Sequence, residues 1–120
     1  MPAQLSTHVL DTAHGCPARG MKIELWFVSD RKRKRLKTVA TNSDGRTVDP
    51  LLSGEEMKAG EYELVFHVGG YFATKATSKT KGRIVFLDRV PVRFGIGDPS
   101  ASYHVPLLCS PWSYSTYRGS

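Results

Sequence analysis

Four histidines are the side chains of this sequence that are best suited to acid–base chemistry near neutral pH. They are His8, His14, His67 and His104. An unperturbed imidazole has a pKa of about 6.5, so it can accept and release a proton at the pH where most enzymes work. A single histidine is most simply a hydrogen-bonding surface residue. The chemistry therefore depends on which histidines share a face of the fold.

Two other reactive arrangements receive little support from the sequence. Imidazole and thiolate also bind zinc, but Cys16 and Cys109 form no C-x2-C pair, and we expect neither a metal site nor another cofactor. The two cysteines are too few for a disulfide scaffold. The G-x-S-x-G elbow of many serine hydrolases is also missing.

The carboxyl-terminal segment SPWSYSTYRGS is unusual for the end of a chain. Chain ends are commonly polar and frayed, but this one contains Trp112, Tyr114 and Tyr117 before Arg118-Gly119-Ser120. Aromatic side chains are unfavourable in water. Either this segment is a last strand packed on the core, or its final residues are held in place for a function.

The elements that must position these residues are predicted to be strands. Apolar and polar residues alternate with period two, which predicts strands over residues 21–28, 61–68, 89–96 and 103–109, and weaker ones over 5–11, 36–41 and 113–118. Turn-rich segments separate them, including a capping box at Ser53 and Glu56. One short helix is predicted within residues 69–79. The pattern predicts an all-β fold, a two-sheet β-sandwich of seven or eight strands with one short helix, in a single domain of residues 1–120.

The same alternation places two histidines on the outer faces of their strands. His8 faces outward with Ser6 and Leu10, whereas His104 faces outward with Pro106 and Leu108. An outer sheet face is normally polar, so apolar residues there predict that another subunit covers it. Imidazoles beneath such a cover are only partly hydrated, which tunes their pKa.

The net charge of +6 comes from one short run. Six of the 17 basic residues lie within residues 31–37, and the remaining basic residues equal the 11 acidic ones in number. A nucleic-acid-binding domain usually spreads its basic residues over a surface. We therefore interpret the run as a solvated hairpin loop and expect no nucleic-acid partner. Salt-dependent binding that is lost when the run is neutralised would support the opposite view.

The sequence shows neither a membrane-spanning helix nor a signal peptide. No apolar run approaches the roughly 18 residues that a membrane-spanning helix needs. Residues 1–12 have neither a basic start nor an apolar core typical of a signal peptide. We therefore expect a cytoplasmic protein without membrane contact.

Three segments together resemble the 5-hydroxyisourate hydrolases, which are transthyretin-related proteins of purine catabolism. They are LSTHVLDTAHGCPARG, TNSDGRT and YHVPLLCSPWSYSTYRGS, and they occur in the family's order over nearly the whole chain. The terminal Tyr-Arg-Gly-Ser is the most specific match, because transthyretin itself lacks this ending. Two features depart from the common pattern: Cys109 replaces a frequent leucine, and the run RKRKRLK is unusually basic.

The resemblance implies a function and a set of site residues. It implies a transthyretin-like homotetramer, a dimer of dimers, that hydrolyses 5-hydroxyisourate to 2-oxo-4-hydroxy-4-carboxy-5-ureidoimidazoline during urate degradation. By motif, the catalytic residues would be His8, Arg46, His104 and Ser120. Substrate binding would add the remaining tail residues, Tyr117, Arg118 and Gly119.

The resemblance leaves two of these roles open. It does not say which of His8 and His104 is the general base. Arg118 could either pin the terminus or act in the site, and the DGRT segment with Arg46 looks like an exposed hairpin turn. A small-ligand carrier on the same scaffold, without catalysis, is the alternative function. The tail argues against a carrier, which has no evident need for it.

Overall fold

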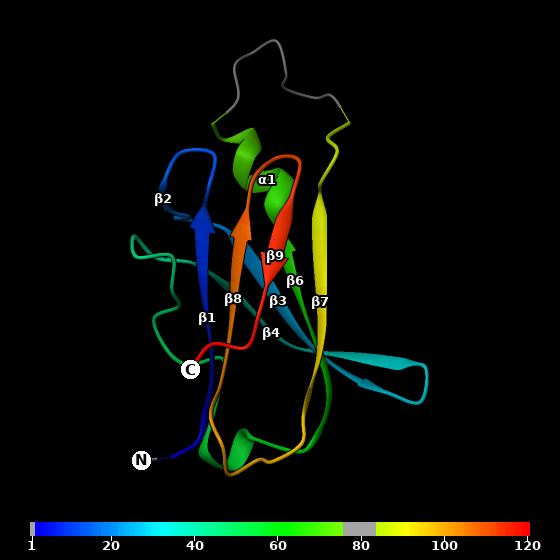
Figure 1. Cartoon of the computed structure of the whole chain (residues 1–120). Coiled ribbons are helices and arrows are strands. Elements are labelled where there is room, and N and C mark those ends of the chain that lie inside the picture. Colours follow the sequence, from blue (N-terminus) through cyan, green and yellow to red (C-terminus); the bar gives the residue numbers. More distant parts are fainter. Residues whose placement is uncertain (1, 76–83) are drawn as a thin grey trace.

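Two β-sheets face each other in the computed structural model, which describes residues 2–75 and 84–120 (Figure 1). Sheet A contains, in spatial order, β2 (Cys16–Pro17), β1 (Gln4–Asp11), β8 (Tyr103–Cys109) and β9 (Tyr114–Thr116), and β5 (Leu52–Ser53) also pairs with β1. Sheet B has the order β4 (Lys32–Ala40), β3 (Lys22–Ser29), β6 (Gly60–His67) and β7 (Arg89–Ile96). The predicted two-sheet sandwich is confirmed. The described residues form nine strands rather than seven or eight, because β2 and β5, each two residues long, are too short to show a period.

The pairing of β1 with β8 is parallel, whereas the other described strand pairs are antiparallel. In its register Ser6 lies opposite His104, and His8 lies opposite Pro106. This pairing joins the amino-terminal STHVLD motif to the carboxyl-terminal YHVPLL motif at the centre of sheet A. The two most distant motifs of the sequence therefore lie side by side.

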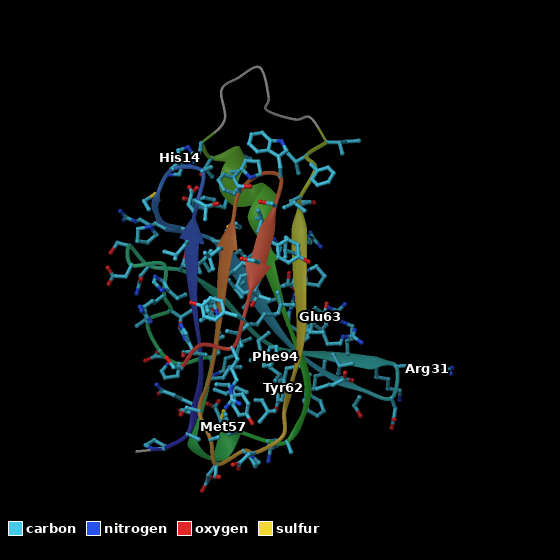
Figure 2. The ribbon with its side chains drawn as sticks, viewed as in Figure 1. His14, Arg31, Met57, Tyr62, Glu63 and Phe94 are labelled. Atoms are coloured by element: carbon cyan, nitrogen blue, oxygen red, sulfur yellow. The ribbon has the colours of Figure 1, made fainter. Side chains whose placement is uncertain are left out.

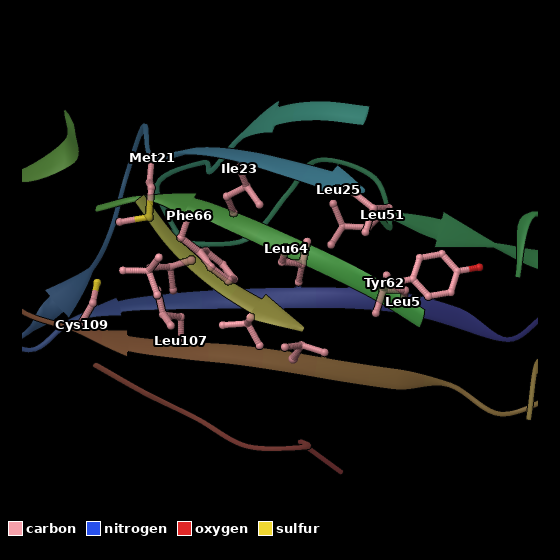
Figure 3. Close-up of a cluster of buried hydrophobic side chains, with 14 of the residues drawn as sticks. Leu5, Met21, Ile23, Leu25, Leu51, Tyr62, Leu64, Phe66, Leu107 and Cys109 are labelled. Carbon is pink, nitrogen blue, oxygen red and sulfur yellow. The ribbon is translucent and has the colours of Figure 1, made fainter. Parts of the chain in front are cut away.

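The hydrophobic core lies between the sheets, and its residues come mainly from β1, β3, β6, β7 and β8 (Figure 3). The large side chains in it that are almost completely buried include Leu5, Met21, Ile23, Leu25, Leu51, Tyr62, Leu64, Phe66 and Leu107. Each such side chain contributes roughly 1.5–3 kcal/mol through its burial. The inward faces predicted for residues 21–28, 61–68 and 103–109 are confirmed. Outward-facing His104 and Leu108 are half-buried, but Pro106 on the same outer face is buried.

The basic run was predicted to be a loop, and this prediction is wrong. Strand β4 begins at Lys32, and the β3–β4 hairpin turns at Asp30 and Arg31, whose φ angles of 44° and 68° are those of a tight two-residue hairpin turn. The hairpin projects from the sandwich, with Arg31 near its tip (Figures 1 and 2).

The charges of the run are accommodated by side chains of sheet B. The Arg33 guanidinium carbon lies 4.2 Å from the centre of the Trp26 ring, and its Nη2 lies 3.4 Å from Oε1 of Glu63. Nη2 of Arg93 lies 3.2 Å from the other oxygen of the same carboxylate. A cation over an aromatic face and a shared anion reduce the repulsion that would otherwise disfavour a strand here.

The helical elements follow the prediction where they are described. Helix α1 (Val68–Ala73) lies within one residue of the predicted start at residue 69, and residues 76–79 of the prediction lie outside the described residues. The 3-10 helix η1 (Gly54–Glu56) has the predicted capping box, in which the Ser53 amide donates to Oε1 of Glu56 at 3.1 Å. Within the described ranges, none of the helices has the length and apolar character needed to cross a bilayer.

Candidate active site

A cavity of about 460 Å³ opens on the outer face of sheet A, beside the start of β8. Five of the seven site residues predicted from the sequence line it: Arg46, His104, Tyr117, Gly119 and Ser120. The rest of its wall consists of Gln4, Ser6, Ser102 and Tyr103. The cavity thus combines one imidazole, one guanidinium, several hydroxyl groups and the end of the chain.

His104 is the histidine that lines this cavity. Its Nδ1 lies 2.8 Å from Oγ of Ser6, and Nε2 makes no hydrogen bond to the described residues. Partial burial lowers the pKa of His104, and the positive charges of Arg46 and His8 lower it further. His104 is therefore neutral at neutral pH, which is the state that a general base requires.

Arg46 reaches the cavity from the loop that links β4 to β5. It was predicted to occupy an exposed hairpin turn; the side chain is exposed, but the turn joins sheet B to sheet A and is not a hairpin. The side-chain oxygen of Asn42 accepts hydrogen bonds from the amides of Asp44 at 2.9 Å and Arg46 at 3.1 Å. These bonds fix the backbone from which the Arg46 side chain projects.

Gly45 locks this turn against β1. The Val9 amide donates to the Gly45 carbonyl at 2.8 Å, and φ of Gly45 is +75°. A Cβ atom at this position would lie 2.4 Å from the Val9 carbonyl oxygen and 3.3 Å from Cδ2 of His8. Only glycine allows this approach, which brings the Arg46 loop next to the histidine strand.

His8 lies on the outer face of β1, as predicted, and it is half-buried. It does not line the cavity, but its charge is close enough to lower the pKa of His104. His8, Arg46 and His104 therefore form one group of neighbouring positive or potentially positive side chains. His14 is separate from this group, because its Nδ1 pairs with Asp11 at 2.7 Å.

The tail folds back along β8 and covers His104. Strand β9 pairs with β8, and the Gly119 amide donates to the His104 carbonyl oxygen at 2.7 Å. A Cβ atom on Gly119 would lie only 2.5 Å from Cδ2 of the imidazole. The backbone at residue 119 is therefore in direct contact with the ring.

Arg118 anchors the tail and does not line the cavity. Its guanidinium carbon lies 4.2 Å from the centre of the Tyr103 ring, and Nη2 donates to the Ser102 carbonyl oxygen at 3.3 Å. Of the two roles left open by the sequence, this geometry is that of an anchor. Tyr117, by contrast, is 60% exposed and reaches the cavity wall.

Sequence reasoning assigned no role to Ser6, the residue that contacts His104. The alternation placed Ser6 on the outer face with His8, but the contact depends on the parallel register between β1 and β8. No pattern within either strand encodes that register. For metals, the described part of the chain brings no three His, Cys, Asp or Glu side chains together in a suitable arrangement.

The sequence is similar to that of known proteins over nearly its whole length. Residues 5–119 match the model of the HIUase/Transthyretin family. The 5-hydroxyisourate hydrolase of Pseudomonas aeruginosa is 50% identical over 117 residues, which cover 98% of this chain and 91% of the relative.

Two solved structures share the fold. The 5-hydroxyisourate hydrolase of Klebsiella pneumoniae is 33% identical with a TM-score of 0.79, over 98% of this chain and 99% of that one. An (S)-allantoin synthase is 49% identical with a TM-score of 0.89, and the match covers 99% of this chain but 44% of that one. The family match over nearly the whole sequence, together with the shared sandwich, shows that this chain belongs to the HIUase/Transthyretin family.

Proposed function

We propose that this protein hydrolyses 5-hydroxyisourate in urate catabolism. The observation that carries the proposal is the convergence of His104, Arg46, Tyr117 and Ser120 on one cavity, from three distant parts of the sequence. Relatives that are about 50% identical and are named 5-hydroxyisourate hydrolases support the choice of substrate.

The reaction requires three functions that these side chains offer. A base must take a proton from water as its oxygen adds to an acyl carbon of the six-membered ring. Donors must stabilise the oxyanion that forms, and the ring C–N bond must then break as the nitrogen receives a proton. The product is a carboxylate and an opened ring, so no redox partner is needed.

His104 is the base in this proposal. It is neutral near pH 7, lines the cavity and keeps Nε2 without a protein partner among the described residues. His8 does not line the cavity and acts on the charge of His104, and the proton that His104 takes from water passes from His104 to the leaving nitrogen. Of the two histidines that the sequence could not separate, the geometry thus favours His104.

Arg46 and the tail orient the substrate. The planar guanidinium presents donors to the oxygen atoms of a flat heterocycle and offsets the negative charge that develops on it. Tyr117 and Ser120 supply further hydroxyl groups to the cavity wall, and Gly119 leaves room for the imidazole. Because Arg118 is bound to Tyr103 and Ser102, its part is to hold the tail.

The proposal includes a homotetramer, a dimer of dimers, that covers the outer face of sheet A. Leu108 is half-buried on this face, and Trp112 and Tyr114 nearby in the sequence are 72% and 44% exposed. An apolar surface of this kind favours association. Light scattering of the purified protein measures the assembly directly, and a monomer at micromolar concentration would contradict it.

The decisive test is the ultraviolet absorbance of freshly prepared 5-hydroxyisourate. We expect the protein to accelerate its decay in proportion to protein concentration, whereas a carrier would protect the compound or leave its decay unchanged. Arg46→Ala should lose most of the acceleration. Arg89→Ala, which removes an exposed arginine from sheet B, is the matched control and should keep it.

A second variant tests the base. His104→Asn should lower kcat by roughly 10²–10⁴-fold, the usual effect of losing an acid–base group, with little change in melting temperature. A loss of less than tenfold would mean that His104 is structural and that another group activates the water.

A further inference from the structure

The hydroxyl group of Ser6 is the side-chain partner of His104 in the cavity wall. Its Oγ lies 2.8 Å from Nδ1, although the two residues are 98 positions apart in the sequence. Both side chains are half-buried, and both line the cavity. A hydrogen bond in this position constrains the orientation of the ring.

The backbone fixes this contact on both sides of the imidazole. Ser6 and His104 are register partners in the parallel β1–β8 pair, so their outward side chains stand next to each other. On the other side, the Gly119 backbone packs against Cδ2 of the ring. The ring is held between a hydroxyl group and a glycine backbone, which leaves the Nε2 edge for the cavity.

A neutral imidazole has two tautomers, and the Ser6 hydroxyl group is compatible with both. If Nδ1 carries the proton, it donates to Ser6 Oγ and Nε2 keeps a lone pair. If Ser6 donates to Nδ1 instead, Nε2 carries the proton and cannot accept one from water. The tautomer therefore decides whether His104 can act as a base towards the cavity.

The surroundings of Nε2 favour the first arrangement. Arg46 lines the same cavity, and its charge affects His104. A guanidinium has only donors, so a nearby lone pair is electrostatically preferred to a second N–H group. The Ser6 hydroxyl proton is then free to point into the cavity.

We propose that Ser6 is a positioning residue that accepts a hydrogen bond from Nδ1–H of His104 and so presents the Nε2 lone pair to the water. This inference rests on the proposed function for its catalytic meaning. The Ser6–His104 pair is itself a property of the resting protein. It can therefore be measured without substrate.

Kinetics of 5-hydroxyisourate decay test the catalytic part. Ser6→Ala should lower kcat by about 10–100-fold, the effect seen where an orienting hydrogen bond to a functional histidine is lost, with a much smaller change in KM. Ser6→Thr keeps the hydroxyl group and should restore most of the rate. Ser29→Ala, at the exposed end of β3, is the matched control for the change of serine to alanine.

The tautomer is read from the ¹⁵N chemical shifts of the His104 ring, assigned by comparison with His104→Asn. We expect a protonated Nδ1 and an unprotonated Nε2 in the wild type, and a mixture of tautomers in Ser6→Ala. A protonated Nε2 in the wild type would overturn the inference, as would a Ser6→Ala protein with unchanged tautomer and rate. If the wild type shows no hydrolysis, the proposed function fails, but the tautomer measurement still decides the role of Ser6.

Discussion

Three features of the structure constrain the side chain of His104. Its ring is half-buried, its Nδ1 is engaged by Ser6, and its Cδ2 is in contact with the backbone of Gly119. Burial and the neighbouring positive charges of Arg46 and His8 disfavour the imidazolium form. The imidazole is thus kept neutral and is contacted on two sides, with one nitrogen available.

The first prediction concerns the titration of this histidine. Because burial and then the charge of Arg46 lower the pKa of His104, its neutral form persists below pH 6.5, and hydrolysis should decline only below that pH. In Arg46→Gln the repulsion is removed, so the pKa should rise towards 6.5. The Hε1 resonance of His104, followed by NMR against pH, measures both values.

The control for this titration is Arg89→Gln, which removes one positive charge from the other sheet. It should leave the His104 midpoint close to that of the wild type. If the titration midpoint of His104 is unchanged or lower in Arg46→Gln, Arg46 does not control the charge of His104.

The second prediction concerns Gly119. In Gly119→Ala the new methyl group would lie 2.5 Å from Cδ2 of His104, so either the ring or the tail must move. We expect at least a tenfold loss of kcat/KM with an unchanged circular dichroism spectrum, since effective geometry depends on displacements of about 1 Å. Gly97→Ala, where a Cβ atom meets nothing within 4 Å, is the matched control and should remain active.

At the level of elements, the tail is an appendage of β8 rather than part of the core. All three residues of β9 are exposed, and the tail is attached through its pairing with β8, the Gly119–His104 hydrogen bond and the stacking of Arg118 on Tyr103. If residues 117–120 are removed, β1, β8 and the core beneath them remain in sheet A. The tail therefore contributes to the site more than to the fold.

The third prediction follows from this separation. Deleting residues 117–120 should leave a folded assembly by scattering and circular dichroism, yet remove most of the hydrolysis, because Tyr117 and Ser120 leave the cavity wall. Arg118→Ala should give an intermediate loss, since the β9 pairing still holds the tail near His104. A truncated protein with normal turnover would refute the role of the tail.

Some of the strands could be predicted from the sequence alone, and others could not. The long strands and their inward faces follow from alternation, because burial of one face has a direct signature of period two. The second half of β4 was predicted as a weak strand over residues 36–41, but its basic first half was missed because the side chains that accommodate Arg33, Trp26 and Glu63, belong to other strands. The two-residue strands and the Ser6–His104 contact were missed for a similar reason. They depend on pairing between distant segments, which local patterns do not encode.

The site residues were predictable by a different route. Outward placement of His8 and His104 followed from alternation, and Arg46 and the tail followed from the resemblance of their motifs. Neither the alternation nor the resemblance could show that Arg118 stacks on Tyr103 or that His8 lies outside the cavity wall. Those facts require the loop and tail conformations.

At the scale of the whole molecule, a buried carboxylate links sheet A to helix α1. The Asp11 side chain is completely buried; it accepts hydrogen bonds from Tyr71 Oη at 2.7 Å and from the His14 amide at 2.9 Å. Burial would raise the pKa of Asp11, but the hydrogen bonds from Tyr71 and His14 outweigh it and lower the pKa. Asp11 is therefore held as a carboxylate in the folded protein.

The fourth prediction is the effect of this carboxylate on acid stability. Because its pKa is lower in the folded state than in the unfolded state, its contribution is complete above the unfolded value of about 3.9 and is lost as the pH falls through the folded value. Asp11→Asn should cost about 1–3 kcal/mol at neutral pH, the usual cost of disrupting a buried charged hydrogen bond. The stability of Asp11→Asn should also depend less on pH in the acid range than the stability of the wild type.

Urea unfolding at several pH values between 2 and 7 measures both effects. Asp44→Asn, which changes an exposed aspartate in the Arg46 loop, is the control for the loss of one negative charge. Equal pH slopes for Asp11→Asn and the wild type would show that this network does not govern acid unfolding.

The parallel β1–β8 pair has a consequence for the order of folding events. Sheet B is built from antiparallel neighbours within residues 22–96, whereas the centre of sheet A joins the first strand of the chain to one that begins at residue 103. Closing so long a loop is entropically slow, so sheet A should consolidate after sheet B. During refolding from urea, hydrolysis of 5-hydroxyisourate should therefore appear later than the far-ultraviolet circular dichroism signal of the strands. The return of activity would then report the pairing of β1 with β8.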